Sequence, residues 1–414
     1  MFKSKKTLML IRQILLIVFV VGLASFSICL AQNSQQFPMP KTKIIVLGVG
    51  HSPQLVAESY QPAVLRAFLD KVNPDAICIE RSPEEFARND FYEFTYEQQY
   101  LTVPYAREHR IPLCPIDWLP AAEDTSLAFG IADLEVPTFI RRTSGFQGFI
   151  SFTDKEDLSL DLFYAETESD REKQRKFANT LPEQAGFDYP RRLYLYRTFM
   201  QTKRIAQAAK AYRGQTVLVV VGSLHKNDIE QILKDDSTIE IVQPSSFGHP
   251  DTKSIAKAIK REDLLAIATF NLLGVQSKTG NINWDWMNRI LKDLEKEKET
   301  AETLLLKTRW QVLTKRITAQ EALSSYQRAS DLAKSDEQFT WTGVKDRSRI
   351  DSYFDPFGNL SIGQRAEIEM ARENNKLKRL SAVEESRKRL MSQLSELKIQ
   401  QLAAYWDEYI LKMD

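Results

Sequence analysis

The sequence predicts an α/β fold, with a mainly parallel sheet and flanking helices, followed by a helical C-terminal region. Two continuous apolar runs, 43–47 and 216–221, have the length and composition of buried parallel strands. Each run ends at a Gly-x-x-His motif. Short apolar runs and amphipathic stretches alternate between the two motifs, as parallel strands with helical crossovers require.

The elements follow from hydrophobic periodicity and from residues that start or stop helices and strands. Proline has no backbone N–H to donate, so Pro112 and Pro115 demote the third strand to an edge or irregular strand. The predicted strands are residues 43–47, 76–79, 111–116, 216–221 and 238–242. The predicted helices are 62–72, 96–109 with a kink at Pro104, and 193–212. A further helix, capped by Asn227 or Asp228, is predicted to continue through Leu233.

Residues 119–190 break this alternation, with many phenylalanines among acidic and glycine-containing turns. An insertion that covers the site and a segment that completes the core are both compatible with their position. From about residue 251, helix formers and charges dominate. A capping box at Ser361 predicts a long helix toward Trp406. We expect this part to pack as a helical appendage on the α/β domain; a coiled-coil partner surface is the alternative.

The first 31 residues have the pattern of a signal peptide, with lysines before an apolar core and small residues before Gln32. We therefore expect cleavage after Ala31 and an exported protein, periplasmic or secreted. An uncleaved leader, or lipidation at Cys29, would instead associate the chain with a membrane. The expected organisation is a signal peptide at 1–31, a linker at 32–42, an α/β domain at 43–250 and a helical region at 251–414.

The charge and the cysteine content of the chain limit the classes of function that it can have. The chain has 56 basic and 55 acidic side chains, and four of the basic ones lie in the leader. Because no overall basic field remains, we do not expect nucleic acid as a partner. Cys78 and Cys114 both fall within predicted strands, so we expect free, buried thiols, although export would permit a disulfide between them.

The candidate site consists of polar residues that follow four of the predicted strands. His51 and His225 end the two Gly-x-x-His motifs, Glu80 follows strand 76–79, and Asp117 follows strand 111–116. Helical crossovers make these strands parallel, so their carboxyl ends share one edge of the sheet. Ligand sites of open α/β sheets lie at that edge. His109 and His249 lack this setting: we expect His109 to be solvated and His249 to be a loop residue within reach of the site.

Two kinds of chemistry fit these residues. Imidazole and carboxylate groups suit a divalent transition metal, held by His51, His225 and Glu80, which would acidify a bound water for hydrolysis. Without a metal, the same residues would perform general acid–base catalysis, with Glu80 orienting or deprotonating a histidine. A purely structural role, in which each residue only caps its own loop, is the third interpretation. Arg81 and Arg197 would bind a carboxylate or phosphate, or pair with Glu80.

These motifs resemble the TraB/GumN and TIKI superfamily, which includes ChaN-like and erythromycin-esterase-like proteins. The resemblance rests on both Gly-x-x-His motifs, on Glu80 after the second strand and on Arg197 within Arg-Thr-Phe-Met, and it covers about residues 43–243. It implies an α/β fold with a metal-dependent hydrolase site in some members and haem binding in others. Tyr196 departs from the pattern, because related sequences often have an acidic residue there.

We therefore expect an exported metal-dependent hydrolase of peptide, amide or ester bonds. His51, His225 and Glu80 would hold a divalent ion such as Mn, Co or Zn, and Glu80, Arg197 and Asp117 would serve catalysis. A protein that binds haem or another ligand without turnover is the alternative. A further alternative is a structural envelope protein that acts through its helical C-terminal third.

Overall fold

A computed structural model describes residues 40–118, 154–179 and 189–412. The predicted signal peptide, most of the predicted linker and much of the stretch at 119–190 lie outside these residues. Residues from Thr42 onward form one compact unit. Among the described helices, none is both long and apolar enough to cross a membrane.

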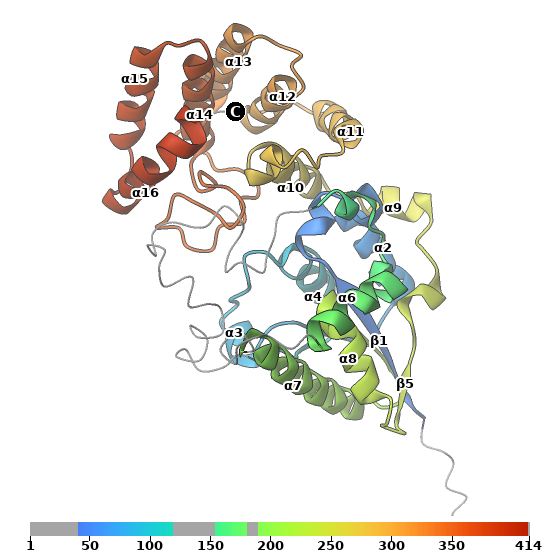
Figure 1. The fold of residues 1–414 in the computed structure, drawn as a ribbon. Coiled ribbons are helices and arrows are strands. Elements are labelled where there is room, and N and C mark those ends of the chain that lie inside the picture. Colours follow the sequence, from blue (N-terminus) through green and yellow to red (C-terminus); the bar gives the residue numbers. More distant parts are fainter. Residues whose placement is uncertain (1–39, 119–153, 180–188, 413–414) are drawn as a thin grey trace, which may run out of the picture. The chain divides into compact units, whose positions relative to one another are not determined.

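Within the described residues, a five-stranded, all-parallel sheet organises the first half of the unit, which confirms the predicted α/β fold (Figure 1). Its order is β3-β2-β4-β1-β5, so the strand before His225 lies directly beside the strand before His51. The third predicted strand does lie at an edge. The strands are β1 (Thr42–Val49), β2 (Ala76–Ile79), β3 (Leu113–Pro115), β4 (Thr216–Gly222) and β5 (Ile239–Ile241).

Side chains that alternate along the strands enter two separate hydrophobic layers. On one face, Ile45 and Val220 pack in the same core as α2 (Pro62–Val72) and α4 (Val103–His109). On the other face, Val46 and Val219 pack with α7 (Tyr189–Ala211) and α8 (Ser223–Leu233). Both faces are buried, which explains why the central strands are apolar without alternation.

Shorter elements connect these layers. They are η1 (Ser52–Leu55), η2 (Glu58–Tyr60), α3 (Pro83–Ala87), η3 (Glu97–Thr102), η6 (Glu156–Ser159), η7 (Tyr164–Glu166), α6 (Glu168–Asn179) and η9 (Pro244–Phe247). The predicted helix at 96–109 is two elements, because η3 is a π-helix that passes into α4 at Val103.

The C-terminal part is helical, and its elements are α9 (Thr252–Ala258), α10 (Arg261–Leu272), η10 (Val275–Lys278), α11 (Trp284–Glu295), α12 (Ala301–Leu313), α13 (Ala319–Leu332), α14 (Ile362–Lys376), α15 (Leu380–Met391), α16 (Glu396–Trp406) and η11 (Asp407–Leu411). The capping box at Ser361 begins α14 as expected. The long helix predicted from there toward Trp406 is wrong. The chain leaves α14 through Lys378, whose φ of 60° is left-handed and ends the helix, and it forms two further helices.

One hydrophobic core extends across residue 250. Leu65 of α2 and Ile79 of β2 belong to the same buried cluster as Ile267 of α10 and Leu305 of α12. Buried polar contacts cross the same position: Arg66 lies 2.7 Å from Asp263 in an ion pair. The change of composition near residue 251 therefore marks a change of secondary structure within a shared core.

Candidate functional site

The strand order brings together the polar residues that follow four strands. Val49 and Gly222 are register partners at the ends of β1 and β4. The segments that carry His51 and His225 therefore leave the sheet from adjacent strand ends. Glu80 follows β2, which lies on the other side of β4, and Asp117 follows the edge strand β3. The expected common edge is therefore present, and Arg197 reaches it from α7.

His51 is held by a carboxylate behind it. Its Nδ1 atom lies 2.9 Å from Oε1 of Glu97, whose side chain is fully buried. Glu97 begins the π-helix η3, and such insertions are frequent at functional sites. The backbone of His51 has a φ of 57°, a conformation that a residue with a β-carbon adopts only when its surroundings impose it. Together these contacts direct Nε2 of His51 toward β4.

His225 is not in the loop that the sequence predicted. The helix α8 begins at Ser223 rather than near Asn227, because Gly222 is itself the N-cap and the helix follows β4 without a loop. His225 therefore lies in the first helical turn. Its ring stacks on Tyr194 with centroids 4.9 Å apart, and its Nδ1 atom lies 2.6 Å from the hydroxyl of Thr198.

The hydrogen bonds of Thr198 define which nitrogen of His225 carries the proton. The hydroxyl of Thr198 donates to the carbonyl of Tyr194 at 2.8 Å. A hydroxyl has one hydrogen, so the Thr198 oxygen accepts from Nδ1–H of His225. The neutral imidazole then has its lone pair on Nε2. That nitrogen faces Oε1 of Glu80 at 3.6 Å.

The two imidazoles and the carboxylate of Glu80 converge above Gly222. A β-carbon added at Gly222 would lie 3.3 Å from both Nε2 of His51 and Oε2 of Glu80, and 3.8 Å from Cδ2 of His225. Glycine, which has no β-carbon, lets His51 and Glu80 approach the end of β4 this closely, although its φ of −50° and ψ of 135° are accessible to other residues.

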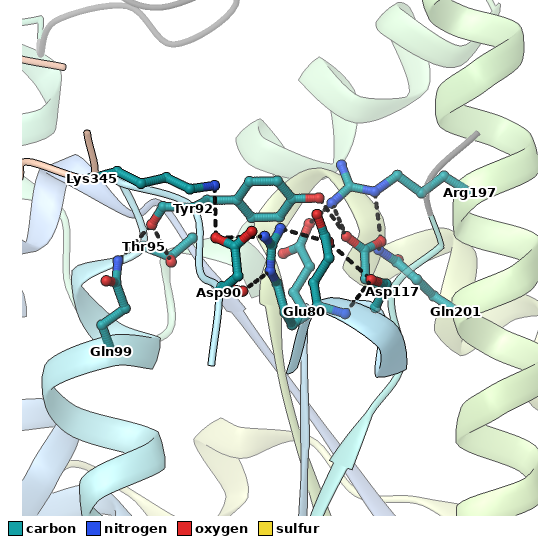
Figure 2. Close-up of polar contacts among 12 residues, drawn as sticks. Glu80, Asp90, Tyr92, Thr95, Gln99, Asp117, Arg197, Gln201 and Lys345 are labelled. Atoms are coloured by element: carbon teal, nitrogen blue, oxygen red, sulfur yellow. Dashed lines mark hydrogen bonds and ion pairs between the residues drawn. The ribbon is translucent and has the colours of Figure 1, made fainter. Parts of the chain in front are cut away.

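Arg197 links the two carboxylates of the site (Figure 2). Its Nε and Nη2 atoms donate to the two oxygens of Asp117 at 2.6 and 2.5 Å, a bidentate pair, and Nη2 also lies 2.9 Å from Oε1 of Glu80. Asp117 is fully buried, and it also accepts from Gln201 at 2.9 Å and from Tyr92 at 3.1 Å. These hydrogen bonds hold the carboxylate of Asp117 in place. Asp117 therefore positions Arg197 and does not face solvent.

Glu80 is the carboxylate that connects this network to the histidines. Its Oε2 atom accepts from the backbone N–H of Gly222 at 2.5 Å, while Oε1 faces both Arg197 and His225. Arg81, the next residue, does not pair with Glu80. It forms ion pairs with Glu85 at 3.0 Å and Asp90 at 3.4 Å.

Opposite pKa shifts distinguish the two histidines. Burial alone would lower the pKa of His51, but the charge and hydrogen bond of Glu97, with the charge of Glu80, outweigh burial and raise it. Burial lowers the pKa of His225 to about 4 against the charge of Glu80, and Arg197 adds to the lowering. At neutral pH His225 is therefore neutral, whereas the environment of His51 favours its cation.

The ion pair between Arg197 and Asp117 is stabilised in its charged form. Burial acts to raise the pKa of Asp117, but the charge and hydrogen bonds of Arg197 outweigh it and lower that pKa. Arg197 in turn has a pKa well above its usual value, because its carboxylate partners outweigh the effect of burial. The site is reached from outside at His51 and Arg197, whose side chains are 19% and 18% exposed.

Two other histidines lie elsewhere. The exposed His109 stacks on Tyr105 with ring centroids 4.1 Å apart, and its Nδ1 atom contacts the Tyr105 carbonyl. His249 is 54% exposed, contacts Asp161 at 3.4 Å and lies against Phe163. Neither has a described contact with the residues above Gly222.

Several residues of the site were not predicted. Glu97 lies in a helical stretch whose composition does not distinguish it, and Tyr194 and Gln201 belong to one helix with no unusual pattern. Thr198 had a weak signal, because it follows Arg197 in the Arg-Thr-Phe-Met segment. Tyr92 joins the network through its ring, which lies over the guanidinium of Arg81 at 4.0 Å, and through its hydroxyl (Figure 2).

The donor set only partly fits a metal ion. His51 and His225 both present Nε2 with Nδ1 bound to an acceptor, the arrangement of histidine ligands in metal sites. Glu80, the third expected ligand, already accepts from Gly222 and from the cationic Arg197. Within the described residues, no group of three or more His, Cys, Asp or Glu side chains is arranged to hold a metal ion.

No family model matches this chain, and comparisons with curated proteins and with solved structures returned no significant match.

Proposed function

We propose that this protein is a hydrolase of ester, amide or peptide bonds that uses His51 and His225 as an acid–base pair. The observation that carries this proposal is the convergence of both imidazoles and Glu80 above Gly222. The resemblance of the two Gly-x-x-His motifs to the TraB/GumN and TIKI superfamily supports the same reaction class. The proposal also includes membership of that superfamily.

His225 serves as the base in this proposal. Its Nε2 atom carries the lone pair, because Nδ1–H is used by Thr198. It takes a proton from a water molecule that attacks the carbonyl carbon of the substrate. The carboxylate of Glu80, 3.6 Å from Nε2, stabilises the imidazolium that forms. The low pKa of His225 keeps this base unprotonated at neutral pH, but it also makes His225 a weaker base.

His51 serves as the acid. Glu97 favours its protonated form, so Nε2–H is available to the oxygen or nitrogen of the leaving group. Two titratable groups whose surroundings push their pKa values apart are typical of an acid and a base in one site. Arg197 holds Glu80 in position and, being partly exposed, adds positive charge near the developing oxyanion.

No step of this mechanism passes through a metal ion, because Glu80 is engaged by Arg197 and Gly222. The divalent ion expected from the sequence stays a prediction. Elemental analysis of the purified protein tests it: a stoichiometric Mn, Co or Zn ion that is lost in His51→Ala would establish a metal site and replace the proposed mechanism.

Hydrolysis of chromogenic esters and aminoacyl anilides by the full chain tests the function. His51→Ala and His225→Ala should each remove most of the activity, and the double variant should add little, since residues acting as a unit are strongly non-additive. His109→Ala is the matched control and should retain activity. Independent, additive losses would contradict a shared site. Absence of turnover, together with a haem Soret band that requires His51, would favour the ligand-binding alternative.

We also propose that the protein is exported and cleaved after Ala31, on the pattern of its first 31 residues. Mass spectrometry of the mature protein should find Gln32 at the N-terminus. Retention of Met1 would contradict cleavage, and a lipid on Cys29 would indicate a membrane-anchored lipoprotein.

A further inference from the structure

Cys78 and Cys114 lie opposite each other in neighbouring strands. They are register partners in the parallel pair β2–β3, so their side chains leave the sheet on the same face. Both thiols are free. Adjacent strands are about 4.8 Å apart, which is within the Cα separations that disulfides span.

The two thiols differ in accessibility. Cys78 is fully buried among the residues under α7, including Ile205. Cys114 is only partly buried, in the short edge strand, and contacts Tyr212 at the end of α7. The hydrogen bond from Cys78 lowers the pKa of Cys114 against the effect of burial. An accessible thiol with a buried thiol behind it is the arrangement of an attacking and a resolving cysteine.

The edge strand gives this pair a physical consequence. The ladder contains only three residue pairs, and Pro115, the partner of Ile79, has no N–H to donate. A covalent bond between β2 and β3 would reinforce this short ladder, which otherwise rests on backbone hydrogen bonds such as that from the N–H of Ile116 to the carbonyl of Ile79. In such a bond, Cys78 lies two residues before Glu80 and Cys114 lies three residues before Asp117. Arg197 connects these two carboxylates.

We propose that Cys78 and Cys114 form a reversible redox site, in which a disulfide links the edge strand β3 to β2. Cys114 thiolate attacks a sulfur of a small disulfide such as oxidised glutathione, forming a mixed disulfide and releasing one glutathione thiol. Cys78 then attacks the Cys114 sulfur and releases the second. Two protein thiols are oxidised, and one small disulfide is reduced to two thiols. Because Cys114 is only partly buried, the bond is accessible to reduction.

The test uses the folded full chain with Cys29→Ser, equilibrated in glutathione buffers of increasing oxidation, then acid-quenched, alkylated and mapped by mass spectrometry. Cys78 and Cys114 should lose alkylation together and appear in one cross-linked peptide pair, and a reducing buffer should reverse this. Independent oxidation of the two thiols, stable glutathione on Cys114, or two reduced thiols in the most oxidising buffer would overturn the proposal.

Two single variants sharpen the experiment. In Cys78→Ala the resolving thiol is absent, so glutathione should accumulate on Cys114. In Cys114→Ala the remaining Cys78 is buried and should stay unmodified while the protein is folded. Equal modification of both variants would contradict the assigned roles. Circular dichroism checks that each is folded, and the wild-type titration decides the proposal if either is not.

Discussion

The Nδ1 atom of His51 lies 2.9 Å from the buried carboxylate of Glu97, across 46 residues of sequence. This contact orients His51 and favours its charged form, because a carboxylate accepts from Nδ1–H and stabilises the imidazolium. His225 has a neutral hydroxyl, that of Thr198, in the equivalent position. The two histidines thus have equivalent places in the sequence pattern and different chemical environments.

Replacement of Glu97 tests this contact. Glu97→Gln retains the shape but removes the charge, so the pKa of His51 should fall toward or below its ordinary value, as measured by NMR titration of the ring. The raised pKa contributes stability that is fully present below about pH 6.5 and is lost as the pH rises through the folded-state value. The variant should therefore lose about 1–2 kcal/mol of unfolding free energy at pH 5 and less at pH 9.

The control for this variant is Glu108→Gln, which removes an exposed carboxylate beside His109. It should leave the His51 titration unchanged. An unchanged His51 titration in Glu97→Gln itself would show that Glu97 does not set the charge of this ring.

His225 predicts a pH dependence of the opposite sign. Its pKa is about 4 in the folded protein and about 6.5 when unfolded, so the unfolded chain binds the additional proton between these values. Stability is therefore lost as the pH falls from about 6.5 to 4, by about 3 kcal/mol at most. Urea unfolding at pH 7 and pH 4.5 should show a smaller difference for His225→Gln than for the wild type. An equal difference in both proteins would refute the buried neutral imidazole.

Much of the fold could be predicted from the sequence, because it depends on local pattern. The apolar runs predict all five strands, and Pro112 and Pro115 predict the edge position of β3. The common edge of the sheet then brings His51 and His225 together without knowledge of any side-chain contact.

Other features depend on contacts between distant segments and leave no periodic signal. Glu97 looks like any polar residue of a helix until the packing of η3 places it against His51. The start of α8 at Ser223 also escaped prediction, since Gly222 caps the helix without a side chain and Asn227 offered a more familiar cap. The composition change near residue 251 gives no information about a shared core.

Gly222 offers a direct test of the close approach of His51 and Glu80 to the end of β4. Gly222→Ala is compatible with the backbone conformation, so the unfolding free energy should change by less than about 1 kcal/mol. The new β-carbon would contact Nε2 of His51 and the carboxylate of Glu80, so hydrolysis should fall by at least about tenfold, which corresponds to about 1.4 kcal/mol in the barrier.

The matched control is Gly363→Ala in α14, where a β-carbon would meet only the Ser330 hydroxyl at 3.8 Å. It should retain activity and gain slightly in stability, because alanine favours a helix more than glycine does. Full activity in Gly222→Ala would show that hydrolysis does not depend on the arrangement of His51 and Glu80 over this glycine.

The last prediction concerns the shared core. A fragment that ends at Pro250 removes α10, whose Leu265, Ile267 and Phe270 are buried in the same cluster as Leu65 of α2. Each such side chain stabilises the fold by about 1.5–3 kcal/mol. The same cut leaves Arg66 without Asp263 and leaves the Leu55 carbonyl without the amide of Asn271, which donates to it at 2.6 Å. Together the three side chains contribute about 4.5–9 kcal/mol, which is comparable to the net stability of most domains, about 5–15 kcal/mol.

We therefore expect the fragment of residues 42–250 to aggregate or to lose cooperative thermal unfolding, whereas the chain of residues 42–414 should unfold cooperatively. The triple variant Arg66→Met/Tyr96→Phe/Asp263→Leu isolates the polar contribution, because it replaces the buried ion pair and the Tyr96 hydroxyl that donates to Asp263 by apolar groups, and it should fold. A sharp unfolding transition of the 42–250 fragment, with native near-ultraviolet circular dichroism, would show instead that the sheet and its own helices suffice for a stable core.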